Sequence, residues 1–451
     1  MSFSSQGSAR VVAILSLTAG CRTEPWETRY GSIADLAVKR DLAISADLAV
    51  SADLAAPADF AVGPDLPVVF DLAVPNDLAA RRDFAVQRDL VTLPPAKQFD
   101  FARPLVFDAC DRPTHIAVAD IDRDGKLDLA VACYGGVVAV LRGDGGGSFG
   151  RAMPMRTDKI NYWTAIADLD GDGRLDIAVS SYASSAGVMR GHGDGTFDPV
   201  VQFNTGIQPY AVEPGDFDGD GRLDLVTANK GSGGIGVLHN LGGGRFADAI
   251  ELGSLSGPYA LALGDLDEDG IRDVAVASWP KPSAVFRGDG HGRFIAISRP
   301  IHPADGGVPD GGIDITDLPG ADLVAVADFD RDGHLDVVTG AQDDATIVYG
   351  MGDGTFEGAV NHPVGSGANG VALADFDFDQ LVDIAVSDEN TNDVAILRGK
   401  LGRDFQPAVS FPAGSAPSSV TAADFNGDGK PDLAVSDFGS NQVSILINIS
   451  N

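Results

Sequence analysis

The sequence contains few of the residues on which many catalytic and metal sites are built. Its 451 residues include only seven His, three Cys, seven Tyr and three Trp, with no His-based metal motif and no Gly-x-Ser-x-Gly element. No stretch reaches the roughly 20 apolar residues that a membrane-spanning helix needs. Lys and Arg number 32 against 65 acidic residues and form no basic stripe. These absences argue against nucleic-acid binding and predict a protein that is not an enzyme.

Aspartate, in contrast, is abundant and occurs in a repeated pattern. The nine-residue pattern D-x-D-x-D-G-x-x-D occurs seven times, starting at Asp120, Asp168, Asp216, Asp265, Asp328, Asp375 and Asp424. Gln380 replaces the Gly of the sixth copy, and Asn426 replaces the second Asp of the seventh. The motif is not an EF-hand, because the twelfth position, which needs a bidentate Glu, is Val179 in the second copy.

Short apolar segments flank every acidic loop. A run such as IAVAD ends at the first Asp and a run such as LAVA follows the last one, which is typical of buried strands. A further strand begins at a Phe after a Gly-rich turn, at Phe149, Phe197, Phe246, Phe294, Phe356 and Phe405. The next loop starts 19 residues after this Phe in five cases and 34 residues after it in the case of Phe294. A surface-loop insertion of 15 residues is therefore expected within residues 302–320.

Each unit of about 48 residues thus contains four short strands, and seven such units predict an all-β fold, a seven-bladed β-propeller with four-stranded blades. The last unit ends in VSILINISN without an outer strand, whereas an unassigned segment, FARPLVF, starts at Phe101, 19 residues before Asp120. We expect this N-terminal segment to complete the seventh blade. Its pairing would close the ring and remove the free edge.

The repeats resemble the FG-GAP and VCBS repeats of seven-bladed propellers, including the integrin α-subunit headpiece, and the expected domain covers residues 95–451. The resemblance implies Ca²⁺ in the loop of each β-hairpin, on one face of the disc. In the integrin propeller the opposite face carries the ligand. No single activity is implied, because such propellers serve as adhesion modules, lectins and enzyme appendages.

Each acidic loop offers oxygen ligands of the kind that Ca²⁺ prefers. Positions 1, 3, 5 and 9 would supply side chains and position 7 a backbone carbonyl. The expected ligands of up to seven Ca²⁺ are Asp120, Asp122, Asp124, Lys126 and Asp128; Asp168, Asp170, Asp172, Arg174 and Asp176; Asp216, Asp218, Asp220, Arg222 and Asp224; Asp265, Asp267, Asp269, Ile271 and Asp273; Asp328, Asp330, Asp332, His334 and Asp336; Asp375, Asp377, Asp379, Leu381 and Asp383; and Asp424, Asn426, Asp428, Lys430 and Asp432.

The alternative is that these Asp residues only cap turns. However, four carboxylates within nine residues would repel one another strongly without a cation. Seven Ca²⁺ would also offset 14 units of the formal net charge of −33. In the sixth loop, Gln380 must adopt the backbone conformation that Gly adopts elsewhere.

The N-terminal residues predict export. The segment VVAILSLTAGC ends at Cys21 and resembles a bacterial lipoprotein signal, although Thr18 stands where Leu is usual. The resemblance implies that residues 1–20 are a signal peptide and that Cys21 is lipidated, at the outer membrane or cell surface. An ordinary secretory signal, which would give a secreted protein, or a buried apolar segment is the alternative.

Residues 21–94 contain a D-L-A-x-x-x pattern in which Asp recurs every six residues and which several prolines interrupt. This composition indicates a disordered, low-complexity tether with no core of its own. A small repetitive solenoid is the alternative.

Cys110 and Cys133 lie at the same end of a predicted hairpin. A disulfide between them is geometrically reasonable, and an exported compartment permits it. Two free thiols are the alternative.

Aromatic residues gather at the strand ends opposite the acidic loops. Tyr162, Tyr210 and Tyr259 lie six residues before a loop, His115 and Trp163 five before, and Tyr134, Tyr182, Trp279 and Phe438 fourteen after its first Asp. Blades five to seven have Gln342, Asp388, Glu389 and Asn390 at similar places. Exposed aromatic rings suit a sugar or a protein partner, whereas the alternative is that they fill the central channel and pack the turns.

These patterns predict a calcium-stabilised, lipid-anchored binding or adhesion module that is not catalytic. Its partner would be a protein or glycan, bound through Tyr134, Tyr162, Trp163, Tyr182, Tyr210, Tyr259 and Trp279. The alternatives are a carbohydrate-binding lectin and a non-catalytic part of a polysaccharide-acting system. Asp388 and Glu389 are the candidate acid–base pair of an enzyme, but a solvated loop is the expectation.

Overall fold

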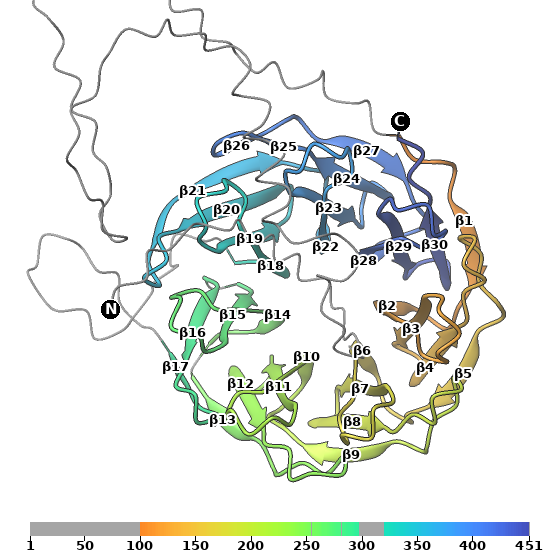
Figure 1. Ribbon diagram of the computed structural model, residues 1–451, viewed down its shortest axis with the longest axis vertical. Coiled ribbons are helices and arrows are strands. Elements are labelled where there is room, and N and C mark those ends of the chain that lie inside the picture. The colour runs from red at the N-terminus through yellow and green to blue at the C-terminus, as the bar shows by residue number, and fades with distance from the viewer. Residues whose placement is uncertain (1–99, 254, 281, 297–319, 451) are drawn as a thin grey trace, which may run out of the picture. The chain divides into compact units, whose positions relative to one another are not determined.

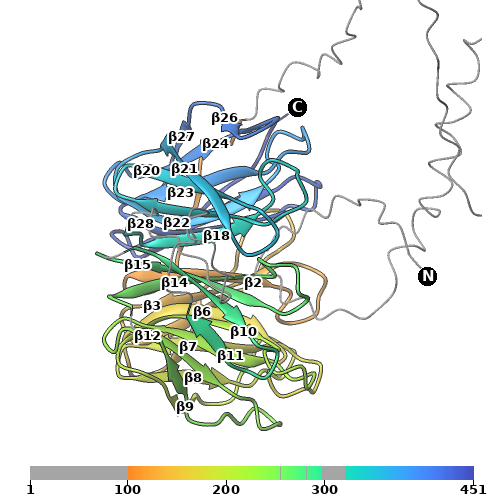
Figure 2. The ribbon, with the colours of Figure 1, turned by 90° about the vertical axis from the view of Figure 1, so that its left-hand side faces the viewer.

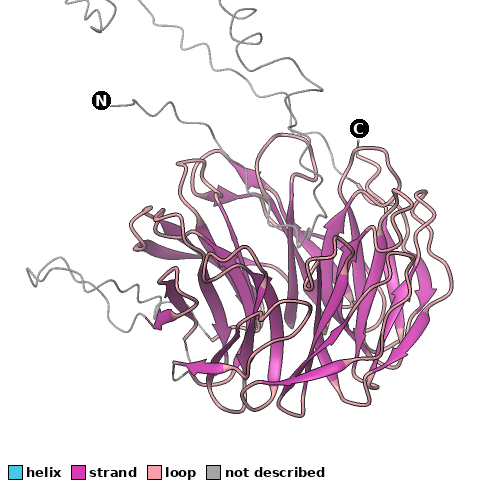
Figure 3. Cartoon of the chain, turned by 60° about the horizontal axis from the view of Figure 1, so that its bottom comes forward, coloured by secondary structure: helices cyan, strands magenta, loops and turns pink. Residues whose placement is uncertain are grey.

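The computed structural model describes residues 100–450 apart from 254, 281 and 297–319. The regular secondary structure of these residues consists of β-strands alone (Figure 3). No helix among them is long and apolar enough to cross a membrane. The predicted signal peptide, the lipidated Cys21, the tether and all but the last residue of the predicted insertion lie outside the described residues.

The described strands form seven four-stranded antiparallel sheets around a central axis, which confirms the predicted β-propeller (Figure 1). The innermost strands are β2 (Pro113–Ala119), β6 (Asn161–Ala167), β10 (Pro209–Gly215), β14 (Pro258–Gly264), β18 (Leu323–Ala327), β22 (Ala368–Ala374) and β28 (Pro417–Ala423). The second strands are β3 (Asp128–Cys133), β7 (Asp176–Ser181), β11 (Asp224–Asn229), β15 (Asp273–Ser278), β19 (Asp336–Ala341), β23 (Asp383–Asp388) and β29 (Asp432–Asp437).

The outer half of each blade completes the sheet. The third strands are β4 (Val137–Leu141), β8 (Ser185–Met189), β12 (Gly234–Leu238), β16 (Ala284–Gly288), β20 (Asp344–Gly350), β24 (Asp393–Leu397) and β30 (Gln442–Leu446). The outermost strands are β5 (Met153–Arg156), β9 (Val201–Asn204), β13 (Ile250–Leu252), β17 (Phe294–Ala296), β21 (Phe356–Pro363), β27 (Val409–Pro412) and β1 (Leu105–Asp108). A small hairpin, β25 (Gly399–Lys400) with β26 (Asp404–Phe405), precedes β27.

Burial explains why the second and third strands of each blade are mostly apolar on both faces. Neighbouring blades pack face to face (Figure 2), so a middle strand is covered on both sides. All six residues of β3 are buried, whereas β1 is largely exposed at the rim. In the core between the first two blades, Ala117 and Val140 pack with Ile166 and Ile177. Strands buried on both faces therefore lack the alternation of half-exposed strands.

The ring closes as predicted. Strand β1 pairs antiparallel with β30, with Leu105 opposite Ile445 and Asp108 opposite Gln442. An isolated bridge between Phe101 and Asn448 extends this contact. The N-terminal strand thus completes the blade that the C-terminal strands begin.

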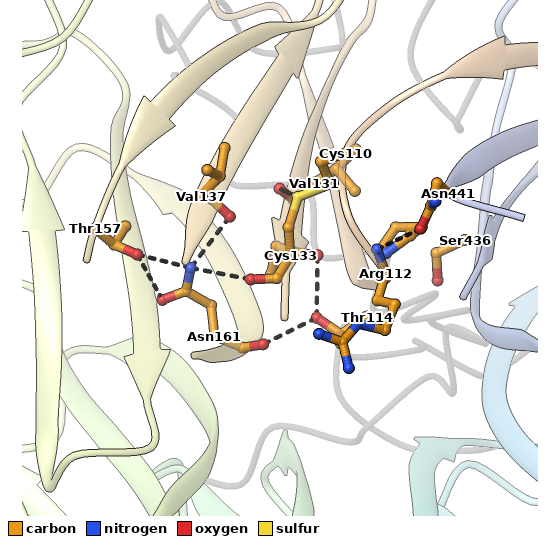
Figure 4. The surroundings of a disulfide bond; sticks show 12 residues. Cys110, Arg112, Thr114, Val131, Cys133, Val137, Thr157, Asn161, Ser436 and Asn441 are labelled. Carbon is orange, nitrogen blue, oxygen red and sulfur yellow. Dashed lines mark hydrogen bonds between the residues drawn. A yellow bond between two sulfur atoms is a disulfide. The ribbon is translucent and has the colours of Figure 1, made fainter. Parts of the chain in front are cut away.

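A disulfide lies beside this closure (Figure 4). Cys110 follows β1 in the seventh blade and is bonded to Cys133 at the end of β3 in the first blade, with 6.1 Å between their Cα atoms. Nearby, the backbone N–H of Arg112 donates to Asn441 Oδ1 at 2.8 Å. The covalent bond therefore connects the closing segment of the last blade to the first one.

Candidate functional site

The two faces of the disc carry different chemistry. The seven acidic loops join each innermost strand to the second strand of its blade, so they lie on one face, called here the loop face. The predicted aromatic residues begin the innermost strands or follow the second strands, at the opposite strand ends. That side is called here the aromatic face.

On the loop face, backbone N–H groups hold the carboxylates in place. In the second loop, Asp168 Oδ1 accepts hydrogen bonds from Gly171 N at 2.8 Å and Asp172 N at 3.1 Å, and its Oδ2 accepts one from Gly173 N at 2.8 Å. Asp170 Oδ1 accepts one from Asp172 N at 3.1 Å. Each loop folds around its first aspartate in a similar way.

The resulting clusters bring carboxylate oxygens close together. Within each cluster the possible metal-ligand atoms lie within 4.8 Å of one another. The clusters include Asp120 with Asp122 and Asp128; Asp168 with Asp170 and Asp176; Asp216 with Asp218 and Asp220; Asp265 with Asp267 and Asp269; and Asp218 and Asp224 with His239. The third loop thus adds an imidazole nitrogen that the sequence pattern did not indicate.

The aspartate at the ninth position also has a structural role that the sequence analysis missed. In the second loop, Asp176 is fully buried, and it accepts hydrogen bonds from Leu169 N at 2.9 Å and Gly191 N at 2.8 Å. It therefore connects the loop to the third strand. Burial raises the pKa of Asp176 to about 6, although both N–H donors lower it. All seven ninth-position residues make the same pair of contacts: Asp128, Asp176, Asp224, Asp273, Asp336, Asp383 and Asp432.

Arginine side chains also form ion pairs with the loop aspartates, and the sequence pattern did not predict these contacts. Arg142 Nε lies 3.3 Å from Asp122 Oδ2, and Arg403 Nε lies 2.7 Å from Asp330 Oδ2. Arg287 makes a similar pair with Asp267. These cations offset part of the repulsion between the carboxylates. The sequence pattern had predicted that a metal ion alone would do so.

The residues present nevertheless fit a hard divalent cation. Asp377 is 1 % exposed, and neither of its carboxylate oxygens has a hydrogen-bond partner within the described residues. Burial, and then the neighbouring Asp379 and Asp375, raise the pKa of Asp377 to about 6, although Arg398, whose Nη1 lies 3.7 Å from Asp377 Oδ2, lowers it. Oxygen-only donor sets of this kind suit Ca²⁺ or Mg²⁺ better than softer metals.

The aromatic face contains one continuous group of rings, called here the tyrosine cluster: Tyr134, Tyr162, Tyr182, Tyr210 and Tyr259. Tyr162 stacks on Tyr210 with ring centroids 4.0 Å apart and meets Tyr134 at 5.9 Å and Tyr182 at 6.0 Å. Tyr259 meets Tyr210 edge-on at 4.9 Å. Residues from the first four blades therefore form a single surface.

A β-bulge places these rings. In six blades the register of the innermost strand shifts near its start, as between Asn161 and Thr164 and between Pro209 and Ala211. Tyr162 and Tyr210 occupy the skipped positions. Because a bulge redirects side chains, the repeated bulge helps to bring Tyr162, Tyr210 and Tyr259 together on the aromatic face.

Two cations accompany the tyrosine cluster, and the sequence analysis had overlooked both. Lys230 Nζ lies 4.4 Å from the ring centroid of Tyr210 and 4.0 Å from that of Tyr259, and it donates to both hydroxyls. The guanidinium of Arg112 lies 4.2 Å from the ring centroid of Tyr134. The face therefore combines aromatic rings with positive charge in a protein that is otherwise acidic.

Two residues predicted on the ligand face are placed differently from the expectation. Trp163 lies in the central channel, where it stacks on His115 with ring centroids 3.7 Å apart. It packs against core residues there, because the bulge of β6 turns it inward. Asp388 is fully buried, whereas Gln342, Glu389 and Asn390 are exposed. Trp279 is exposed as expected.

The sequence matches the FG-GAP-like repeat family over six overlapping segments, residues 120–179, 168–227, 216–276, 265–339, 328–386 and 375–435. The chain belongs to this family. None of the curated proteins matches it.

This FG-GAP-like propeller is similar to several solved structures at low sequence identity. The complex of BBS1N with ARL6DN gives a TM-score of 0.51 at 14% identity, covering 77% of this chain and 98% of that chain. An Agrocybe aegerita lectin that recognises non-reducing terminal N-acetylglucosamine gives 0.45 at 18% identity, covering 76% and 87%. A catalytically inactive virginiamycin B lyase from Staphylococcus aureus gives 0.48 at 13% identity, covering 77% and 99%. Similarity at these identities concerns the fold alone.

The two irregular repeats of this FG-GAP-like propeller keep the geometry of the others. Gln380 has a φ of +70°, compared with +82° for Gly173. Its N–H donates to Asp375 Oδ2 at 2.8 Å, as Gly173 does to Asp168. Asn426 Oδ1 accepts a hydrogen bond from Asp428 N at 2.9 Å. All seven loops therefore have the same local fold.

Proposed function

We propose that the protein is a calcium-stabilised binding module that engages a protein or glycan at the cell surface through the aromatic face, without catalysing a reaction. The observation that carries this proposal is the tyrosine cluster, in which rings from four blades meet beside Lys230 and Arg112. Rings that contact one another offer a partner a larger continuous apolar surface than isolated exposed rings do.

The chemistry of the cluster suits recognition. Tyrosine offers a large apolar surface together with a hydroxyl that can hydrogen bond. Tyr182 is 39 % exposed, and its hydroxyl accepts a hydrogen bond from Gln208 Nε2 at 2.6 Å. Lys230 and Arg112 would attract carboxylate or sulfate groups of a partner.

The acidic loops would hold Ca²⁺ on the opposite face and so stabilise the blades that carry the cluster. The donors would be the side chains at the first, third, fifth and ninth positions of each loop, and the ninth-position aspartate would also hold the loop on its blade. Because Ca²⁺ takes six to eight oxygens, water or backbone carbonyls would complete its coordination.

Export as a lipoprotein through Cys21 remains part of the proposal. A lipid anchor followed by the low-complexity segment 21–94 would present the propeller at the outer membrane or cell surface. Mass spectrometry of the protein purified from its native membrane would test this by detecting, or failing to detect, a diacylated Cys21.

A binding screen on a glycan array and on surface-protein fractions, with and without Ca²⁺, tests the function. Tyr182→Ala should abolish or strongly weaken binding of any partner found. Phe378→Ala is a matched control, because Phe378 is an exposed aromatic residue (40 %) in the sixth acidic loop, on the other face. Partner binding that is lost with Phe378→Ala and kept with Tyr182→Ala would contradict the proposal.

A carbohydrate-binding lectin is the second candidate. The partly exposed ring of Tyr182 beside the amide of Gln208 favours it, because sugars stack on aromatic rings and hydrogen bond to neighbouring amides. Binding to glycans alone would support the lectin, and binding to proteins alone would support the adhesion module.

A further inference from the structure

The central channel holds a cavity that lies apart from the tyrosine cluster. The innermost strands enclose about 650 Å³, which lies within the range of roughly 300–1,000 Å³ typical of small-molecule sites. Most of the wall is aliphatic and includes Ala165, Ala262, Leu323, Val326, Ala372 and Val420. The channel is therefore an apolar chamber on the axis of the ring.

Glu213 departs from the pattern of this wall. It lies three residues before the first Asp of its loop, where the other blades have Ala117, Ala165, Ala262, Ala325, Ala372 and Thr421. Burial raises the pKa of Glu213 to about 7, although the hydrogen bond from Trp163 lowers it. A carboxyl group is costly in such surroundings. Since alanine suffices at the same position in five blades, the fold itself does not require this glutamate.

Trp163 fixes the carboxyl group of Glu213 in position. Its Nε1–H donates to Glu213 Oε1 at 2.8 Å, and its ring stacks on His115 with an interplanar angle of 18°. Burial lowers the pKa of His115 to about 3, so the imidazole is neutral. Trp163 also packs against the core cluster between the fourth and fifth blades, which includes Ala260 and Val324. The indole therefore spans the channel and presents the carboxyl group beside an aromatic wall.

The charges that line the cavity favour a cation. Apart from Glu213, the ionisable residues of the lining are His115, Asp265, Asp322 and Arg272. Asp265 belongs to the fourth acidic loop. Without it, two carboxyl groups line the cavity together with one guanidinium and one neutral imidazole. When it is ionised, the carboxyl group of Glu213 in the wall of an apolar chamber complements a positive group attached to an apolar body.

We propose that the channel binds a small organic ammonium ion that carries an apolar group, with Glu213 as its counter-ion. The ammonium group donates hydrogen bonds to the Glu213 carboxylate, and the apolar group packs against Trp163 and the aliphatic wall. This site is separate from the tyrosine cluster and does not depend on the function proposed above.

Isothermal titration calorimetry on the full chain in Ca²⁺ tests the proposal, with phenethylamine as the probe and 2-phenylethanol as its neutral counterpart. Phenethylamine should bind at one site per chain, and 2-phenylethanol should bind at least about tenfold more weakly. Glu213→Gln keeps an acceptor for Trp163 and removes the charge. It should weaken phenethylamine binding by about tenfold or more and leave 2-phenylethanol binding unchanged.

Glu251→Gln is the matched control, because Glu251 is an exposed carboxylate on β13 of the same blade, and it should change neither affinity. Glu213→Ala provides a second variant, since alanine occupies this position in five other blades and should be compatible with folding. The proposal is overturned if phenethylamine does not bind, if both probes bind equally well, or if both Glu213 variants fold and bind phenethylamine as the wild type does.

Discussion

Asp388, the last residue of β23, shows how a single buried carboxyl group affects stability. It is fully buried, and burial followed by the nearby carboxyl groups of Asp393 and Asp343 raises its pKa from 3.8 to about 7. Between these two values the unfolded chain has lost the proton that the folded protein keeps, so the free energy of unfolding falls as the pH rises. Asp388→Asn mimics the protonated form. It should stabilise the protein by roughly 1–4 kcal/mol at pH 8 and have little effect near pH 4.

Thermal unfolding at both pH values measures this difference. Glu389→Gln serves as the control, because this neighbouring acid is exposed and should shift the melting temperature little at either pH. A gain of equal size at both pH values would show that the effect of Asp388→Asn does not come from its proton.

The sequence alone predicts the positions and contacts of some residues but not of others. The acidic loops were predictable because one spacing recurs seven times, and even the left-handed conformation of Gln380 follows from the Gly that it replaces. The contact of Arg403 with Asp330 was not predictable, since it joins residues 73 positions apart in different blades. The inward position of Trp163 depends on a bulge that strand periodicity does not reveal.

At the level of single elements, the closing strand β1 and its disulfide form one unit. The Cys110–Cys133 bond encloses a separation of 23 residues and connects the segment after β1 to the end of β3. A loop of this length corresponds to about 3 kcal/mol of stabilisation in the chain-entropy model. Replacing both cysteines by Ala should therefore lower the free energy of unfolding by about this amount.

Urea denaturation in the presence and absence of a reductant measures this loss. Wild-type protein in the reductant should match the double variant, and the reductant should not affect the variant. Thiol titration shows whether the disulfide is present. If the wild-type protein is equally stable with and without it, the expected contribution of the disulfide is contradicted.

At the level of the whole molecule, the propeller depends on ring closure. Deleting residues 21–90 should leave its stability nearly unchanged, because β1 is retained. Deleting residues 21–108 removes β1 and exposes the edge of β30. It also removes Phe101, which packs edge-on against Phe411 at 5.0 Å. We expect aggregation or a large loss of stability. Calorimetry and size-exclusion chromatography compare the two truncations, and equal behaviour would refute the role of β1 in closure.

The last prediction concerns the seven acidic loops acting together. With a dissociation constant of about 10⁻⁴ M, as in extracellular calcium modules, each loop would add about 1.4 kcal/mol of stability at about 1 mM Ca²⁺, and seven loops would add about 10 kcal/mol. Chelation should therefore lower the melting temperature substantially. Contacts such as that of Arg142 with Asp122 do not need the metal, so the chelated protein should remain folded at low temperature.

Melting curves recorded in Ca²⁺, in excess EDTA, and after the return of Ca²⁺ or of Mg²⁺ measure this effect. Ca²⁺ should restore the original curve. Mg²⁺ should restore less of it, because the smaller ion requires strict octahedral geometry and keeps its water. If elemental analysis shows that the metal has been removed and the curve is unchanged, then the N–H donors and arginines alone stabilise the loops. The aspartates would in that case be turn-forming residues and not calcium ligands.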